Sequence, residues 1–179
     1  MKSLIDAIAT KLAVKIKEAN PEETASVEVM KFALFGIIHN TLTFATALIV
    51  GLCLGQLLET LLAAFSFMIL RFVSGGYHFK TPLSCLLFSS FVFVLIPFIP
   101  MQGTSVIIIN SISLILVLLF APSNIREHIR VSEKFFPIFK VISALLVGAG
   151  FLLDNPIIIL AFFVQSITLI TFKKEVNNP

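Results

Sequence analysis

The sequence contains few charged residues. Asp, Glu, Lys and Arg make up 13% of its 179 residues, whereas soluble domains contain about 25%. Hydrophobic residues make up 58%, and the mean hydropathy is +1.03. A water-soluble domain of this size cannot bury so much apolar side chain. The scarcity of charge therefore predicts one integral membrane domain over residues 1–179.

Several motifs are also missing. The sequence has no basic stripe with interleaved aromatic residues and no zinc-finger spacing, which argues against nucleic-acid binding. It has no Cys-x-x-Cys or His-x3-His spacing and few acidic residues in its apolar segments. We therefore expect no metal site and no cofactor. The first 20 residues are charged and lack the apolar core of a cleavable signal peptide, so we expect the N-terminus to be retained.

Apolar segments separated by Pro, Gly and polar turns predict an all-α fold. A helix needs roughly 17–25 apolar residues to cross a membrane, and several segments are near the short end of that range. We expect a polytopic membrane protein with about six transmembrane helices, preceded by an N-terminal amphipathic helix. The expected spans cover about residues 32–54, 57–73, 83–99, 105–121, 136–153 and 156–172.

The N-terminal segment, residues 3–18, has the amphipathic pattern of a helix. Apolar residues form a stripe at helical spacing, and lysines lie off that stripe. Such a helix either lies at the membrane surface or offers a docking surface for a substrate or partner. Ser3 and Asp6 fit a capping box at its start, and Asn20-Pro21 is expected to begin the next helix. The stripe consists of Leu4, Ile5, Ile8, Leu12 and Ile16.

The positive charges indicate how the chain crosses the membrane. With six spans, both termini and the connections after the second and fourth spans lie on one side. All 13 Lys and Arg residues fall in these regions or in the adjoining helix ends. By the positive-inside rule, we expect that side to be the cytoplasm.

One polar stretch between the second and third spans combines a cation, a glycine pair, a base and a nucleophile. Residues 71–85 read Arg-Phe-Val-Ser-Gly-Gly-Tyr-His-Phe-Lys-Thr-Pro-Leu-Ser-Cys. Thr81-Pro82 predicts a helix start, which places Cys85 in the first turn, where the positive helix end favours a thiolate.

His78 is the candidate base for Cys85. On one straight helix the two residues would stand roughly 10 Å apart, but Gly75, Gly76 and Pro82 predict a bend that can bring them together. A cysteine nucleophile beside a histidine performs thiol acyl transfer. The spacing alone also fits a loop histidine and a packed cysteine.

The second cysteine, Cys53, is expected near the opposite end of the first span. Much of the ~30 Å hydrocarbon core would separate it from Cys85, whereas a disulfide needs Cα atoms within about 7 Å. We therefore expect no intramolecular disulfide and interpret Cys53 as a small packing residue.

The whole arrangement resembles the accessory gene regulator B family of membrane cysteine endopeptidases in bacterial quorum sensing. The likeness rests on Arg71, the Gly75-Gly76 pair, His78 and Cys85 in a six-span chain with an amphipathic N-terminal helix. It implies that the protein cleaves a short linear pro-peptide at the cytoplasmic face of the bacterial cell membrane. It also implies help in closing the product to a thiolactone or lactone, with His78 and Cys85 as the catalytic pair, and it suggests a homodimer.

Three residues are expected to support this pair. Gly75 and Gly76 could admit the substrate backbone or present N–H groups to an oxyanion, or they could serve only the turn. Arg71 could hold a substrate carboxylate, or it could be the snorkelling end of the second span.

A third residue that orients His78 is not identified from the sequence. Asn40 and Glu28 are candidates, although each fits a structural role equally. His39 and His128 are expected to be interface residues.

Two other functions fit a polytopic membrane protein. A peptide transporter would need ionisable residues near the membrane midplane and an inverted repeat, and the sequence offers almost none of the first and no clear sign of the second. A non-enzymatic membrane adaptor would use the N-terminal helix as its docking face and would not need Cys85.

Overall fold

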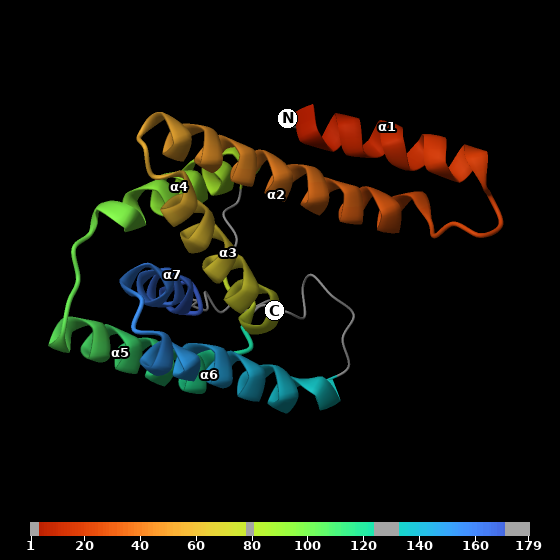
Figure 1. Ribbon diagram of the computed structural model, residues 1–179. Coiled ribbons are helices and arrows are strands. Elements are labelled where there is room, and N and C mark those ends of the chain that lie inside the picture. Colours follow the sequence, from red (N-terminus) through yellow and green to blue (C-terminus); the bar gives the residue numbers. More distant parts are fainter. Residues whose placement is uncertain (1–3, 78–80, 124–132, 171–179) are drawn as a thin grey trace, which may run out of the picture.

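The fold is all-helical, as the sequence predicts. The computed structural model describes residues 4–77, 81–123 and 133–170, so His78 and His128 lie outside the described residues. Within those ranges, seven α-helices and two short 3-10 helices follow one another (Figure 1). They are α1 (Leu4–Ala19), α2 (Val27–Cys53), α3 (Leu57–Ser74), α4 (Pro82–Leu95), η1 (Ile96–Phe98), α5 (Thr104–Phe120), η3 (Glu133–Phe135), α6 (Phe136–Leu153) and α7 (Pro156–Ile167).

Six of these helices correspond to the six apolar segments. The helices α2, α3 and α6 are long and apolar enough to cross a membrane, whereas α4, α5 and α7 are shorter apolar helices. The predicted ends of 57–73, 105–121 and 136–153 agree with the structure to within one residue. The helix α4 stops at Leu95 because the next turn contains Pro97, whose ring opposes a continued α-helix.

The helix α3 is central to the packing. It contacts α2, α4, α6 and α7, and α7 also packs against α5. In Figure 1, α1 and α2 form an antiparallel hairpin at the top, α5 and α6 run side by side at the bottom, and α3 and α7 lie between them. An apolar cluster that includes Leu70, Val117 and Phe162 surrounds the last turns of α3.

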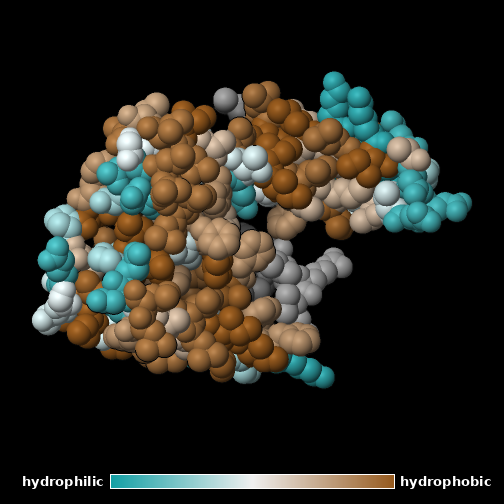
Figure 2. All heavy atoms as spheres, viewed as in Figure 1, coloured by the Kyte–Doolittle hydropathy of each residue, from teal (hydrophilic) through white to brown (hydrophobic). Residues whose placement is uncertain are grey.

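Most of the molecular surface is apolar. Figure 2 shows hydrophobic side chains over most of the face in view, with hydrophilic ones gathered around the connection between α1 and α2 and at the opposite edge. Leu58 and Phe72 are each 73% exposed and Leu152 is 88% exposed. Soluble proteins rarely expose apolar surface on this scale, whereas lipid covers it in a membrane protein.

Cys53 is part of this exposed surface, so its prediction as a packing residue is wrong. It is the last residue of α2, and its neighbours Leu52 and Leu54 are exposed as well. The last residues of α2 therefore do not pack against the neighbouring helices. Both Cys53 and Cys85 are free thiols.

The predicted amphipathic helix is present as α1, which packs lengthwise against α2 (Figure 1). Its fully buried residues are Ala9 and Ala13, one turn apart. Small side chains of this kind allow two helices to approach closely. Most of the apolar stripe stays on the outside, for example Leu4, which is 78% exposed. That stripe is available to lipid or to a partner, as both interpretations of the sequence require.

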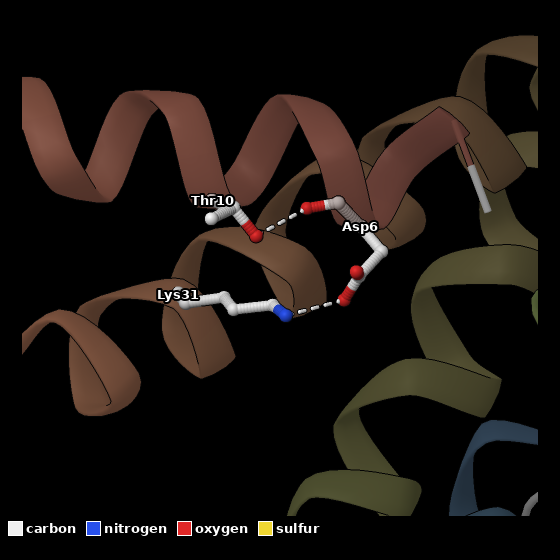
Figure 3. Close-up of polar contacts among 3 residues, drawn as sticks. All are labelled: Asp6, Thr10 and Lys31. Atoms are coloured by element: carbon white, nitrogen blue, oxygen red, sulfur yellow. Dashed lines mark hydrogen bonds and ion pairs between the residues drawn. The ribbon is translucent and has the colours of Figure 1, made fainter. Parts of the chain in front are cut away.

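An ion pair joins the start of α1 to α2, and a hydrogen bond within α1 lies beside it. The Asp6 carboxylate forms an ion pair with Lys31 Nζ at 2.8 Å, and the Thr10 hydroxyl donates to the Asp6 carbonyl at 2.7 Å (Figure 3). Ser3, the other member of the predicted capping box, lies outside the described residues.

The predicted start of α2 at Asn20-Pro21 is wrong, because α2 begins at Val27 with Ser26 as its N-cap. The Asn20 side chain does accept from the Glu23 N–H, at 3.4 Å, but this turn is not continued. Lys17 Nζ donates to the carbonyl oxygens of Pro21 and Thr24 at 2.7 and 2.8 Å. These carbonyls are then satisfied by a cation instead of by helical N–H groups.

A tight contact between α5 and α6 yields a stability prediction. A Cβ atom on Gly150 would lie 2.8 Å from Oδ1 and 3.0 Å from Nδ2 of Asn110, a fully buried residue that donates to the Val147 carbonyl. We expect Gly150→Ala to lower the free energy of unfolding by ~1–3 kcal/mol through overpacking. Thermal unfolding in detergent measures the change. Gly148→Ala is the matched control, since a Cβ there meets nothing within 4 Å, and its midpoint should not fall.

Candidate active site

The turn after α3 has a backbone that requires glycine. Gly75 has φ 71° and ψ −140°, and Gly76 has φ 128°. Residues with side chains rarely adopt such values, because the Cβ atom collides with the neighbouring backbone. The Gly75-Gly76 pair of the sequence is therefore required by the course of the chain at this turn.

Backbone hydrogen bonds tie this turn to two distant segments. The Gly76 N–H donates to the Ser123 carbonyl, and the Ser123 N–H donates to the Ser74 carbonyl, both at 2.9 Å. The Tyr77 N–H donates to the Thr168 carbonyl at 2.8 Å. The end of α3 is thereby held against the segment after α5 and the C-terminal end of α7, next to which it lies in Figure 1.

The same bonds bear on the predicted oxyanion role of the glycines. The Gly75 N–H donates to the Arg71 carbonyl at 2.9 Å, and the Gly76 N–H is bonded to Ser123. Both N–H groups are thus engaged within the protein. The structure favours the alternative in which the glycines form the turn.

Arg71 holds the turn from the side of α3. Its Nη2 donates to the Tyr77 carbonyl at 2.8 Å, and its Nη1 donates to Gln165 Oε1 at 3.2 Å. Its guanidinium also lies over the Phe67 ring, 5.8 Å from the ring centre, which is within the range of a cation–π contact. A snorkelling arginine would point its guanidinium into water, whereas Arg71 binds the protein on several sides.

Cys85 lies where the sequence predicts, in the first turn of α4. Thr81 is the N-cap and its hydroxyl accepts from the Ser84 N–H at 3.2 Å, while Pro82 occupies the first helical turn. The Cys85 N–H makes an early helical bond to the Thr81 carbonyl, also at 3.2 Å. The half-buried thiol is within electrostatic range of the Arg71 guanidinium. A helix N-terminus and a nearby cation are typical surroundings of reactive cysteines.

The structure thus brings Arg71 of α3 against Gly76 of the turn, and Cys85 at the start of α4 is within electrostatic range of Arg71. Gly75 precedes Gly76 in the same turn. The partner predicted for Cys85, His78, lies between the described residues Tyr77 and Thr81 and outside the described ranges. The pairing of His78 with Cys85 therefore stays a prediction.

Sequence reasoning did not identify His39 as a neighbour of this site. Its imidazole stacks on Phe35 with ring centres 6.2 Å apart, and it is within electrostatic range of Arg71. Its Nδ1 is buried and has no hydrogen-bond partner among the described residues. The two candidates that the sequence offers for a third residue, Asn40 and Glu28, are exposed.

Sequence reasoning also missed Gln165 and Thr168, both near the end of α7. A Cβ atom on Gly76 would lie 2.6 Å from Thr168 Oγ1 and 3.2 Å from Gln165 Nε2, so these side chains pack directly on the turn. The available signal was the single amide in the apolar segment Pro156–Ile167, since a polar residue in such a helix is a functional candidate. Among the described residues, no three His, Cys, Asp or Glu side chains gather to hold a metal ion.

A family model for accessory gene regulator B matches residues 6–172. The chain belongs to the accessory gene regulator B family. That range includes the turn after α3, the start of α4 and the end of α7, so the whole site lies within the matched part of this accessory gene regulator B chain.

Curated relatives carry the same family name. An AgrB-like protein of Halalkalibacterium halodurans is 34% identical over 110 residues, which cover 62% of this chain and 56% of that protein. An AgrB-like protein of Listeria welshimeri is 32% identical over 109 residues, 59% of this chain and 53% of that protein. The chain thus spans about half the length of these two relatives. The accessory gene regulator protein B of Staphylococcus aureus is 28% identical over 152 residues, 78% of this chain and 81% of that protein. No solved structure matches this accessory gene regulator B chain.

Proposed function

We propose that this accessory gene regulator B protein is a membrane-embedded cysteine endopeptidase. It cleaves a short linear pro-peptide at the cytoplasmic face of the bacterial cell membrane and assists closure of the product to a thiolactone or lactone. The observation that carries the proposal is the position of Cys85, in the first turn of α4 and within electrostatic range of Arg71. A helix N-terminus and a nearby cation are typical surroundings of a nucleophilic cysteine.

The reaction follows from a thiolate and a histidine base. His78 takes the proton of Cys85, and the sulfur attacks the carbonyl carbon of the scissile peptide bond. As the C–N bond breaks, His78 gives the proton to the leaving amine, and the N-terminal part of the peptide remains on Cys85 as a thioester. A thiol or hydroxyl of the bound peptide then gives its proton to His78 and attacks the thioester carbonyl. The bond between that carbonyl and the Cys85 sulfur breaks, the sulfur takes the proton back from His78, and the ring is closed.

The assignment of His78 as the base rests on the sequence motif. The preceding residue, Tyr77, has its N–H bonded to Thr168 and its carbonyl bonded to Arg71. In this proposal, Arg71 positions the turn and places a positive charge within electrostatic range of Cys85, and it need not bind a substrate carboxylate.

We propose that all six apolar helices cross the membrane, with the termini and the site on the cytoplasmic side. The 12 residues of α7 and the 14 of α4 correspond to about 18 and 21 Å at ~1.5 Å per residue. These lengths are below the ~30 Å of an average hydrocarbon core. A locally thinned bilayer accommodates short spans at modest cost. A homodimer, with the exposed stripe of α1 facing lipid or the pro-peptide, completes the proposal.

A thioester-trapping experiment tests this function. The protein in lipid nanodiscs is mixed with a candidate short linear pro-peptide, and both are analysed by mass spectrometry. We expect a shortened peptide and an adduct on the segment that contains Cys85, which hydroxylamine removes. Cleavage that proceeds without this adduct and resists iodoacetamide would contradict the proposal.

The same materials discriminate the two alternatives. A peptide transporter would move uncleaved peptide into proteoliposomes even in a Cys85→Ala chain. An adaptor would bind its partner normally after alkylation of Cys85. The cysteine peptidase would not cleave peptide after either treatment, because the Cys85→Ala substitution and the alkylation of Cys85 each remove the nucleophile.

A further inference from the structure

Gln165 is a fully buried amide in a helix that is otherwise almost entirely apolar. Burying an amide without hydrogen bonds costs several kcal/mol, so such a group is retained only where it has partners. Gln165 has four. Its Nε2 donates to the Gly75 carbonyl at 2.6 Å and to Ser74 Oγ at 3.1 Å, and its Oε1 accepts from Arg71 Nη1 at 3.2 Å and from Thr168 Oγ1 at 3.1 Å.

The two ends of this amide hold different parts of the site. The donor end holds the backbone of the turn at Gly75, and the acceptor end holds the guanidinium of Arg71. Because an amide is planar and rigid, it fixes the guanidinium relative to the turn. Arg71 in turn donates to the Tyr77 carbonyl at 2.8 Å, so the guanidinium is bonded both to Gln165 and to the residue that follows the glycine pair.

Comparison with the next residue shows that these contacts are specific. Ser166 is equally buried, but its hydroxyl donates to the Phe162 carbonyl in its own helix at 2.7 Å. The hydrogen bond of the Ser166 hydroxyl is thus made within α7, as is common for serine in apolar helices. Gln165 instead uses its donor end and one acceptor contact on residues that lie at least 90 positions away in the sequence.

We propose that Gln165 is a positioning residue of the cysteine peptidase site. Its amide holds the Arg71 guanidinium against the Gly75-Gly76 turn. The inference rests on the proposed function. It adds a residue of α7 to a site otherwise built from α3, α4 and the turn between them.

Alkylation of the two free cysteines tests the inference without any peptide. In wild type, Gln165→Leu and Gln165→Glu, the rates of iodoacetamide modification of Cys85 and Cys53 are measured by mass spectrometry in nanodiscs. Gln165→Leu releases Arg71, and Gln165→Glu offsets its charge with a carboxylate. We expect the rate at Cys85 to fall roughly 3- to 10-fold in each variant, because a cation near the thiolate is lost or neutralised. The rate at Cys53, at the far end of α2, is the internal control and should not change.

Peptide cleavage supplies the second readout. Since Gln165 is buried and acts through other groups, we expect kcat to fall roughly 10-fold or more in both variants while KM changes less than about threefold. Ser166→Ala is the matched control in the same helix and should cleave and alkylate like wild type. Thermal unfolding in detergent identifies which variants are folded, and either Gln165 variant alone is sufficient for the comparison.

The outcomes separate the two hypotheses. Folded Gln165 variants that alkylate and cleave like wild type would overturn the role of Gln165 and leave the peptidase proposal intact. A wild type that cleaves no peptide would overturn the proposed function, while the alkylation rates would still decide whether Gln165 positions Arg71. A rise in KM with kcat unchanged would show that Gln165 binds substrate, which also contradicts the inference.

Discussion

A Cys85→Ala chain is expected to insert into the membrane and leave the pro-peptide uncleaved. The substitution removes the sulfur that forms the thioester and changes little else, because Cys85 is only half-buried and the N-cap contact of Thr81 does not involve its side chain. Removal of a nucleophile lowers kcat by several orders of magnitude, so a loss of at least ~1000-fold is expected. The measurement is the mass spectrum of the peptide after co-expression with wild type or variant.

The other cysteine provides the control. Cys53→Ser removes an exposed thiol at the end of α2, and it should cleave like wild type. Cys85→Ser, which keeps a hydroxyl of similar size, should remain almost inactive, because a serine hydroxyl is far less ionised than a thiol at neutral pH. Complete cleavage of the pro-peptide by Cys85→Ala would contradict the cysteine peptidase hypothesis.

The helices were predictable because their signals are local. Thr81-Pro82 and Asn155-Pro156 each combine a capping side chain with a proline that fits the first helical turn. The structure confirms the helix start predicted at Thr81-Pro82 and has the same kind of start at Asn155-Pro156, where Asn155 Oδ1 accepts from the N–H groups of Ile157 and Ile158 at 3.0 and 3.3 Å. The predicted positions of α4 and α7, and hence of Cys85 in its first turn, depended only on such neighbours.

The start of α2 shows where local reasoning fails. Asn20-Pro21 has the same capping chemistry as Asn155-Pro156, yet the helix begins at Val27. The difference is Lys17, which comes from the preceding helix and donates to two carbonyls of the turn. The Asn20-Pro21 cap and the contacts of Lys17 favour different conformations of these residues. The sequence pattern alone does not show which of the two is more stable.

The site was only partly predictable. Residues 71–85 contain the predicted catalytic pair and the residues predicted to support it. The glycines at positions 75 and 76 mark a turn in the sequence without any knowledge of the packing. Its supports, Ser123, Gln165 and Thr168, come from segments far along the chain that reach the turn only through the packing of α5 and α7 against α3. For the same reason the sequence does not decide whether Arg71 contacts substrate or is a snorkelling helix end, whereas the structure shows that it donates to Gln165.

Gly76→Ala is expected to lower peptide cleavage about 100-fold. An alanine at φ 128° would be strained by ~1–3 kcal/mol. Its Cβ would also lie 2.6 Å from Thr168 Oγ1, which adds ~1–3 kcal/mol of overpacking. Each ~1.4 kcal/mol corresponds to a factor of ten in rate. In Gly76→Ala the native conformation of the turn would therefore be populated far less often, and cleavage would slow accordingly. The measurement is the initial rate of cleavage in nanodiscs, with thermal unfolding as the check on folding.

Two further variants separate the strain from the collision. Gly55→Ala places an alanine at φ 71° with nothing within 4 Å of its Cβ, at the connection between α2 and α3, so it should cleave like wild type. Gly76→Ala combined with Thr168→Ala removes the nearest colliding atom and should cleave at least about threefold faster than Gly76→Ala alone. If the double variant is no faster, the collision with α7 contributes nothing, and the backbone angle of Gly76 alone explains why glycine is needed there. If the double variant is faster, the packing of α7 on the turn limits the reaction, as expected for a site that α7 helps to hold in place.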